Sequence, residues 1–201
     1  MSLYLAPDGL PRCGWAGAAP EFLAYHDTEW GFPVADDVRL FEKLSLESFQ
    51  SGLSWRTILA KRPGFRAAFA GFDLRAVAAF DVDDVTRLLG DTGIVRHRGK
   101  IEAVINNARR ALDLQAERGS LAAFFWGYQP SPVEIPEPQS VSTSPSAIAL
   151  SKDLKRRGWK FVGPTTVFAF MQAMGLVNDH ATGCTTRSLA DRRRGAFTRP
   201  G

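Results

Sequence analysis

The sequence predicts an all-α fold, arranged as one domain or as two closely packed lobes. Apolar residues recur at intervals of three and four over most of the chain, whereas the strict alternation typical of half-buried strands is nearly missing. Alanine-rich stretches such as residues 66–70 and 74–80 also favour helix, because alanine has the highest helix propensity. With 201 residues and 45% hydrophobic side chains, the chain can form a full core, which excludes wholesale disorder.

Eight helices are expected, separated by glycine, proline or aspartate. In chain order they cover residues 36–49, 52–61, 74–80, 82–90, 99–117, 119–127, 145–157 and 165–174. Residues 128–145 carry five prolines, which do not fit a regular helix, so this stretch is expected to be a long surface connection. Residues 1–11 are expected to be a loose N-terminal extension, and residues 185–201 a flexible, arginine-rich tail.

The chain carries a formal net charge of +4, and this excess lies in the C-terminal tail. The tail after Cys184 has five arginines and one aspartate, so residues 1–184 hold 20 basic and 20 acidic side chains. Within that part, residues 96–110 and 152–160 are locally basic, and they are either phosphate-binding patches or solvated helix ends. There is no run of about 18 apolar residues and no signal-peptide pattern, so we expect a cytoplasmic protein without a membrane partner.

Two cysteines and two of the three histidines have spacings that suggest a metal site. Cys13 and His26 are separated by 12 residues, and His180 and Cys184 by three, an offset that places two side chains on one helical face. Two cysteines and two histidines form a closed tetrahedral ligand set suited to structural zinc. Metal-free burial of the same side chains in the core is the alternative. A catalytic zinc is disfavoured because it requires an open coordination position.

The segment from residue 145 to residue 178 has the pattern of a helix-hairpin-helix, with the motif at about residues 146–175. A basic helix ends at Gly158, a four-residue turn follows, and Gly163 precedes a proline at the first position of the next helix. Backbone N–H groups in such a turn can bind a phosphate without reading sequence, which makes Lys160, Gly163 and Thr165 candidate phosphate contacts. A plain helical hairpin would have a similar sequence.

An acidic residue, Glu47, lies in an apolar segment eight residues before Trp55, and Gly52 between them permits a turn. Trp15 and Tyr25 are further aromatic residues beside polar ones. A carboxylate among aromatic rings is typical of a functional pocket. The alternative is that Glu47 forms a helix cap or a salt bridge and that the rings belong to the core.

Several ordered motifs together closely resemble the 3-methyladenine DNA glycosylase I family. They are Arg12-Cys-Gly-Trp15, Tyr25-His-Asp-Thr-Glu-Trp-Gly31, Leu46-Glu47, Gln50-Ser-Gly-Leu-Ser-Trp55, Gly93-Ile-Val-Arg-His-Arg-Gly-Lys-Ile101, Lys160-Phe-Val-Gly163, Phe170-Met-Gln-Ala-Met-Gly-Leu-Val-Asn-Asp-His180 and Gly183-Cys184. The resemblance runs from about Arg12 to Cys184. It implies a mostly helical fold of the helix-hairpin-helix glycosylase superfamily, with one domain of two packed lobes over residues 12–184.

The resemblance also implies one structural zinc that joins the N- and C-terminal segments through Cys13, His26, His180 and Cys184. It implies a pocket for the excised base. That pocket is formed by Glu47, Trp15, Tyr25, Trp55 and Phe22, the last standing where the family often has tyrosine. Glu47 would accept hydrogen bonds from the exocyclic amino group of adenine, and the rings would hold the cationic base between their π faces.

The implied activity is release of 3-methyladenine from alkylated double-stranded DNA by a monomeric, monofunctional glycosylase. Gly52 and Leu53 would wedge into the space left by the flipped nucleotide. Thr165 and Thr166 occupy the place where bifunctional relatives carry a nucleophilic lysine, so no strand nicking is expected. A zinc-stabilised protein that binds damaged DNA without cleaving the glycosidic bond is the alternative, although such a protein would have no need of Glu47 and the aromatic pocket.

Overall fold

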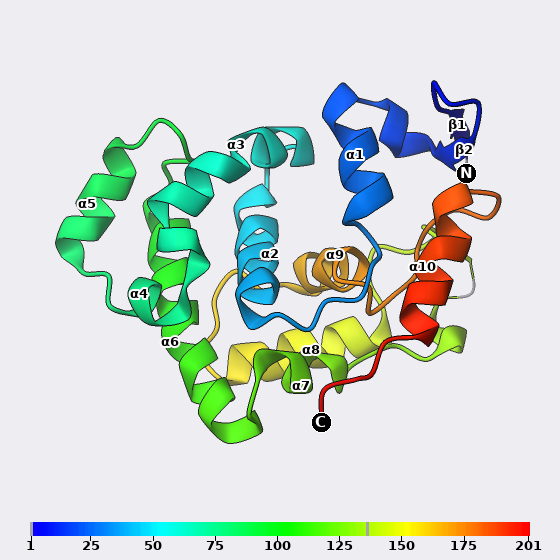
Figure 1. Ribbon diagram of the computed structural model, residues 1–201. Coiled ribbons are helices and arrows are strands. Elements are labelled where there is room, and N and C mark those ends of the chain that lie inside the picture. Colours follow the sequence, from blue (N-terminus) through cyan, green and yellow to red (C-terminus); the bar gives the residue numbers. More distant parts are fainter. Residues whose placement is uncertain (1, 136) are drawn as a thin grey trace.

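The computed structural model describes residues 2–135 and 137–201, so Met1 and Pro136, which fall within the expected N-terminal extension and proline-rich connection, lie outside the described residues. Within these ranges the chain forms ten α-helices, three short 3-10 helices and one strand pair (Figure 1). The α-helices are α1 (Pro20–Thr28), α2 (Asp37–Gln50), α3 (Trp55–Ala68), α4 (Leu74–Ala78), α5 (Val82–Gly90), α6 (Arg98–Arg118), α7 (Leu121–Trp126), α8 (Pro145–Arg156), α9 (Pro164–Ala173) and α10 (Thr185–Gly195). The other elements are β1 (Leu3–Leu5), β2 (Pro11–Cys13), η1 (Gly14–Gly17), η2 (Ala70–Phe72) and η3 (Pro132–Glu134).

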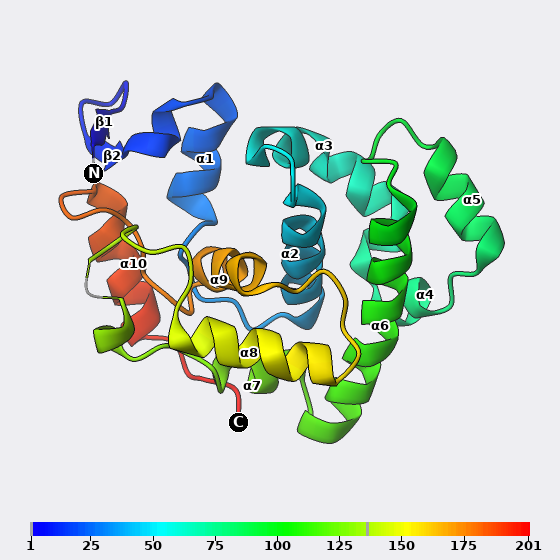
Figure 2. The same cartoon turned by 180° about the vertical axis from the view of Figure 1, so that it is seen from behind.

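Helix α2 forms the centre of the molecule and packs against α3, α6, α7 and α9. In both views α4, α5 and α6 lie at one end, while α1, α10 and the two strands lie at the other (Figures 1 and 2). Because neighbours surround α2, every residue from Leu40 to Phe49 is buried, including the charged side chains of Glu42, Lys43 and Glu47. A helix that is buried on all sides usually lacks charges, so each of these three needs a partner inside the protein.

The eight helices expected from apolar periodicity are confirmed as α2 to α9, with shifts at their ends. The largest shift is in α3, which was expected over residues 52–61. The helix begins at Trp55 because the side chain of Ser54 accepts a hydrogen bond from the backbone N–H of Thr57. It then continues through Pro63 to Ala68. The expected helix ended at residue 61 because a proline usually ends or kinks a helix.

Both ends of the chain, which were expected to be loose, form regular elements in the structure. Strand β1 pairs antiparallel with β2, with Tyr4 opposite Arg12, and the tail forms α10. Three-residue strands are too short to show an alternating pattern. In α10 only Thr186 and Ala190 are buried, so the helix has almost no apolar face that periodicity could reveal.

The core is rich in stacked and edge-to-face aromatic rings. Phe49 packs on Phe65 with ring centroids 4.6 Å apart, and Phe69 stacks on Phe72 at 5.6 Å. All four rings are fully buried between α2, α3 and η2. Among the described helices, none combines the length and apolar character that crossing a membrane requires.

Asp37, at the start of α2, joins that helix to α6 and α7. One carboxylate oxygen accepts hydrogen bonds from the side chain of Gln115 and the backbone N–H of Leu121, at 2.6 and 2.9 Å. The other oxygen accepts from the N–H of Ala122 at 3.0 Å. These two N–H groups belong to the first turn of α7 and have no partner within their own helix. A single carboxylate therefore fixes the entry of α7 against the central helix.

We expect Asp37→Ala to lower the free energy of unfolding by about 1–3 kcal/mol, because it leaves buried donors without an acceptor. Urea denaturation followed by circular dichroism measures this. Asp113→Ala is the matched control, since the side chain of Asp113 is 65% exposed and its ion pair with Arg110 lies on the surface. Equal destabilisation by both substitutions would contradict the capping role of Asp37.

Candidate active site and metal centre

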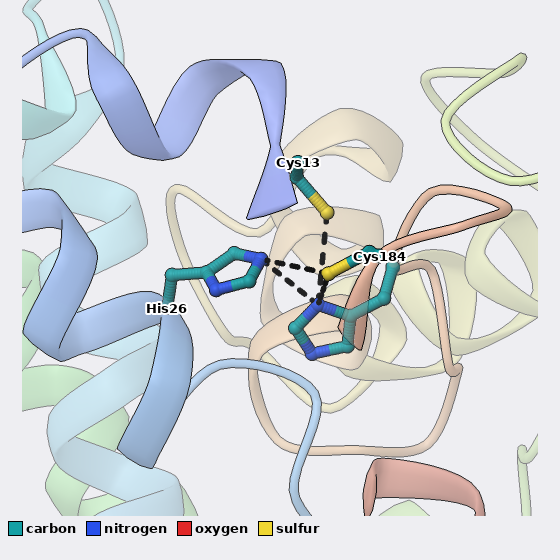
Figure 3. Close-up of side chains that lie close together, drawn as sticks. Cys13, His26 and Cys184 are labelled. Atoms are coloured by element: carbon teal, nitrogen blue, oxygen red, sulfur yellow. Dashed lines mark hydrogen bonds between the residues drawn. The ribbon is translucent and has the colours of Figure 1, made fainter. Parts of the chain in front are cut away.

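The side chains of Cys13, His26, His180 and Cys184 meet at one buried point between the two ends of the chain (Figure 3). Cys13 ends β2, His26 lies on α1, and Cys184 caps the start of α10. One potential ligand atom from each of the four lies within 4.8 Å of all the others. The spacing pattern in the sequence thus corresponds to a real cluster in space.

Hydrogen bonds orient both imidazole rings of this cluster. His26 Nδ1 lies 2.7 Å from Asp27 Oδ1, and His180 Nε2 lies 3.0 Å from the carbonyl oxygen of Trp30. The opposite nitrogens, His26 Nε2 and His180 Nδ1, face the two sulfur atoms at 3.6 to 3.8 Å. A metal-binding histidine typically uses its second nitrogen in this way. Hydrogen bonds from Cys13 and from the two imidazoles lower the pKa of the Cys184 thiol.

A cavity of about 440 Å³ opens beside this cluster and brings together the predicted pocket residues. Glu47 reaches it from α2, Trp55 from the start of α3, and Phe22 and Tyr25 from α1. The complete lining is Trp15, Phe22, Tyr25, Trp30, Lys43, Glu47, Gln50, Trp55, Gln139, Val141, Ala169 and Gln172. The cavity therefore has a largely aromatic wall and a buried carboxylate.

The aromatic wall rests directly on the histidines of the cluster. The ring centroids of Trp15 and His26 are 5.1 Å apart, and those of Trp30 and His180 are 4.8 Å apart. The two tryptophans also contact each other edge to face at 5.1 Å. Displacement of either histidine would move a ring that lines the cavity.

Lys43 is the partner that makes burial of Glu47 possible. Its ammonium lies 2.7 Å from Glu47 Oε1, donates a 2.7 Å hydrogen bond to the hydroxyl of Tyr25, and sits 3.4 Å from the ring centroid of Trp55. Burial lowers the pKa of Lys43, and the charge of Glu47 opposes that shift. Burial and the charge of Glu47 raise the pKa of Tyr25 well above its ordinary value, so its phenol stays protonated.

Asp179 holds two sides of the cavity together. It is fully buried, and its carboxylate accepts 2.6 Å hydrogen bonds from the backbone N–H of Gln139 and the side chain of Gln172. Gln139 also donates to the carbonyl of Asp179 at 3.0 Å. Burial raises the pKa of Asp179. The proline-rich connection is thereby fixed to α9 at the cavity wall.

The turn between α2 and α3 presents an apolar side chain to solvent. Gly52 has a φ of +80°, which favours glycine, and Leu53 is 42% exposed. The buried Lys100 anchors this turn, because its ammonium donates to the carbonyl oxygens of Phe49 and Ser51 at 2.9 and 2.5 Å. Lys100 belongs to the basic segment 96–110, so part of that segment is used inside the protein.

The turn between α8 and α9 is held by side chains from three helices. Gly158, with a φ of +84°, ends α8 in a Schellman motif, in which the next residue, Trp159, donates to the carbonyl of Leu154. Side chains donate hydrogen bonds to four backbone carbonyl oxygens of this turn. Asn106 donates to Gly158, Asn107 to Lys160, Ser48 to Phe161 and Ser151 to Val162. The side chains of Lys160 and Thr165 are exposed, and Gly163 caps α9.

Sequence reasoning missed several residues of the cavity. Lys43 and Gln50 lie four residues before and three residues after Glu47, so helical spacing alone could have placed them on the same face. Gln139 and Val141 come from an irregular connection. Nothing in the local sequence indicates that this connection passes over the cavity.

The comparisons agree with this geometry. Residues 15–188 match the family model for methyladenine glycosylase. "DNA-3-methyladenine glycosylase 1" of Escherichia coli strain K12 is 49% identical over 179 residues, which is 87% of this chain and 96% of that protein. A crystal structure of 3-methyladenine DNA glycosylase I matches with a TM-score of 0.80 at 48% identity, covering 87% of this chain and 98% of that one.

A further solved structure is that of 3-methyladenine DNA glycosylase I from Staphylococcus aureus, which describes the structural basis of 3-methyladenine recognition by that enzyme. It matches with a TM-score of 0.81 at 38% identity and covers 88% of this chain and 96% of that one. The region that matches the family model contains three of the four residues of the buried cluster, namely His26, His180 and Cys184, and every residue that lines the cavity. With its motifs, its helical fold and its aromatic cavity all in agreement, this chain belongs to the methyladenine glycosylase family.

Proposed function

We propose that this protein is a monomeric, monofunctional glycosylase that releases 3-methyladenine from alkylated double-stranded DNA. The observation that carries the proposal is the buried carboxylate of Glu47 in a cavity lined by Trp15, Tyr25 and Trp55. A flipped base needs flat apolar walls and one polar group that reads its edge. Glu47 accepts hydrogen bonds from the exocyclic amino group of adenine, and an oxo group at that position would leave the carboxylate unmatched.

Cleavage of the glycosidic bond of this base requires little general acid catalysis by the protein. A base methylated at N3 is cationic while it is attached to the sugar, so the electron pair of the C1′–N9 bond leaves with the base and makes it neutral. Water adds to C1′ and releases a proton. Recognition and flipping of the damaged nucleotide are therefore the main tasks, with Phe22 and the other rings of the cavity holding the base.

DNA is held at two turns of the protein in this proposal. The α8–α9 hairpin serves as a helix-hairpin-helix, in which the N-terminus of α9 at Gly163 and Thr165 binds a backbone phosphate and Lys160 adds a positive charge. Leu53, next to Gly52, enters the duplex where the nucleotide has left. Since Thr165 and Thr166 follow Pro164 in the first turn of α9, where a lysine nucleophile would be expected, the product keeps an uncleaved strand.

We further propose that Cys13, His26, His180 and Cys184 bind one structural zinc. Their soft sulfur and imidazole donors fit Zn²⁺, and the second nitrogen of each ring is already hydrogen-bonded. When bound, the ion supplies a cross-link between the two ends of the domain. A metal held by four protein ligands would have no open position for a substrate, so the residues around the neighbouring cavity carry the reaction.

Glu47→Gln keeps the size of the side chain but removes its charge. We expect release of 3-methyladenine from methylated duplex DNA to fall roughly 10- to 150-fold, from loss of about 1.5–3 kcal/mol of hydrogen bonding to a charged group. Chromatography of the released base gives the rate, and alkali-free gels check that the strand stays intact. Glu42→Gln, on the same helix but outside the cavity, is the control. Duplex binding without base release by the wild type would instead favour a damage-binding protein.

Cys184→Ser is expected to remove one equivalent of zinc per chain. A loss of about 3 kcal/mol of stability would lower Tm by roughly 6–12 °C for a chain of this size. Hydrogen exchange should rise in both β1 and α10, because both ends depend on the cluster. Thr185→Ala, at the exposed neighbouring position, is the control. Metal-free wild type with the same Tm as the untreated protein would refute the zinc proposal.

Leu53→Ala tests the wedge. We expect kcat/KM on methylated duplex DNA to fall about tenfold, because the extrahelical nucleotide loses the group that takes its place. Activity on a methylated single strand should change little, since no stack has to be opened there. Stability should also change little, given that Leu53 is 42% exposed. An equal loss of activity on both substrates would contradict the wedge.

A further inference from the structure

Lys43 gives the base cavity an internal positive charge. Its ammonium contacts the carboxylate of Glu47, the hydroxyl of Tyr25 and the face of Trp55, which are the groups proposed to hold the base. Lys43 and Glu47 are each only 6% exposed, so their charges are weakly screened by water. The carboxylate that would attract a cationic base is therefore already neutralised by a residue one helical turn away.

We propose that Lys43 is a specificity-determining residue that makes the cavity favour the neutral, departed base over the cationic, attached base. The inference rests on the proposed glycosylase activity and deepens it. A cation that approaches Glu47 meets the ammonium of Lys43 at short range. It must either tolerate the repulsion or displace an ammonium from three partners, and both weaken its binding. A neutral base encounters neither penalty.

This preference acts in the direction of bond cleavage. When the C1′–N9 bond breaks, its electron pair moves to the base, the base loses its positive charge, and the charge passes to the sugar before water adds and a proton leaves. An unpaired Glu47 would stabilise the attached cation and so resist this transfer. Lys43 offsets that stabilisation, because its repulsion of the base falls as the bond breaks. The ion pair thus keeps a hydrogen bond acceptor for the amino group without trapping the charged substrate.

Two free bases separate the effect of charge from that of shape. The first is 3-methyladenine, which is neutral when free at pH 8. The second is the 3,9-dimethyladenine cation, which keeps the charge of the attached base. Calorimetry gives Kd for each with wild type, Lys43→Met and Lys43→Gln. In both variants we expect the ratio of the cation's Kd to the neutral base's Kd to fall at least about tenfold, a change of 1.4 kcal/mol.

Two further proteins make this experiment decisive. Lys43→Arg retains the charge and should keep the wild-type ratio, and Lys152→Met, at an exposed position on α8, should keep it too. Lys43→Gln retains a hydrogen bond donor for Glu47, so it tests the proposal even if Lys43→Met does not fold. An unchanged ratio in folded Lys43→Gln, or the same decrease in Lys43→Arg, would overturn the proposal.

Kinetics provide an independent readout. In single-turnover excision, Lys43→Gln should bind methylated duplex DNA more tightly yet release the base about tenfold more slowly. Equal or faster release would overturn the proposal. A wild type that releases no base would refute the glycosylase function itself. In that case the two Kd values still report on Lys43, so the two failures are distinguishable.

Discussion

The meeting of Cys13, His26, His180 and Cys184 is the constraint on which the site depends. It joins β2 and α1, near the start of the chain, to the segment that leads into α10. The same two histidines support Trp15 and Trp30, so the position of the aromatic wall follows from the position of the cluster. The buried cluster and the cavity are therefore separated by one layer of side chains, and neither can be altered in isolation.

A second constraint is the burial of charge in α2. Glu42 is paired with Arg66, Glu47 is paired with Lys43, and Lys43 has Tyr25 and Trp55 as further neighbours. A buried charge is tolerated only where partners replace water. The central helix accordingly carries the cavity carboxylate, Glu47, in an ion pair whose other member also faces the cavity. The same groups that make burial of the charge possible are those proposed to recognise the base.

Local patterns in the sequence predicted the helices that have a clear apolar face and the four residues of the cluster. These local patterns did not predict features that depend on contacts between residues distant in the sequence. Helix α10 has too few buried residues for periodicity, and Gln139 reaches the cavity only because Asp179, forty residues away in the chain, holds its backbone. Lys43 is a different case, since its spacing from Glu47 was visible in the sequence. The pattern of an amphipathic helix predicts that a lysine is exposed to solvent. Only the fold shows that α2 has no solvent-exposed face at Lys43.

The rigidity of the α8–α9 turn has a consequence for the proposed complex with DNA. Four of its carbonyls are held by Ser48 and by side chains of α6 and α8, which leaves the loop little freedom to change shape. Where a protein surface is rigid, the nucleic acid has to change its conformation to fit it. In the proposed complex the duplex would have to bend and open to fit this turn, and the energy of that deformation depends on how well its bases stack and pair. The rigidity of this one loop would thus favour binding where the DNA duplex is poorly stacked or paired, before the protein contacts the damaged base.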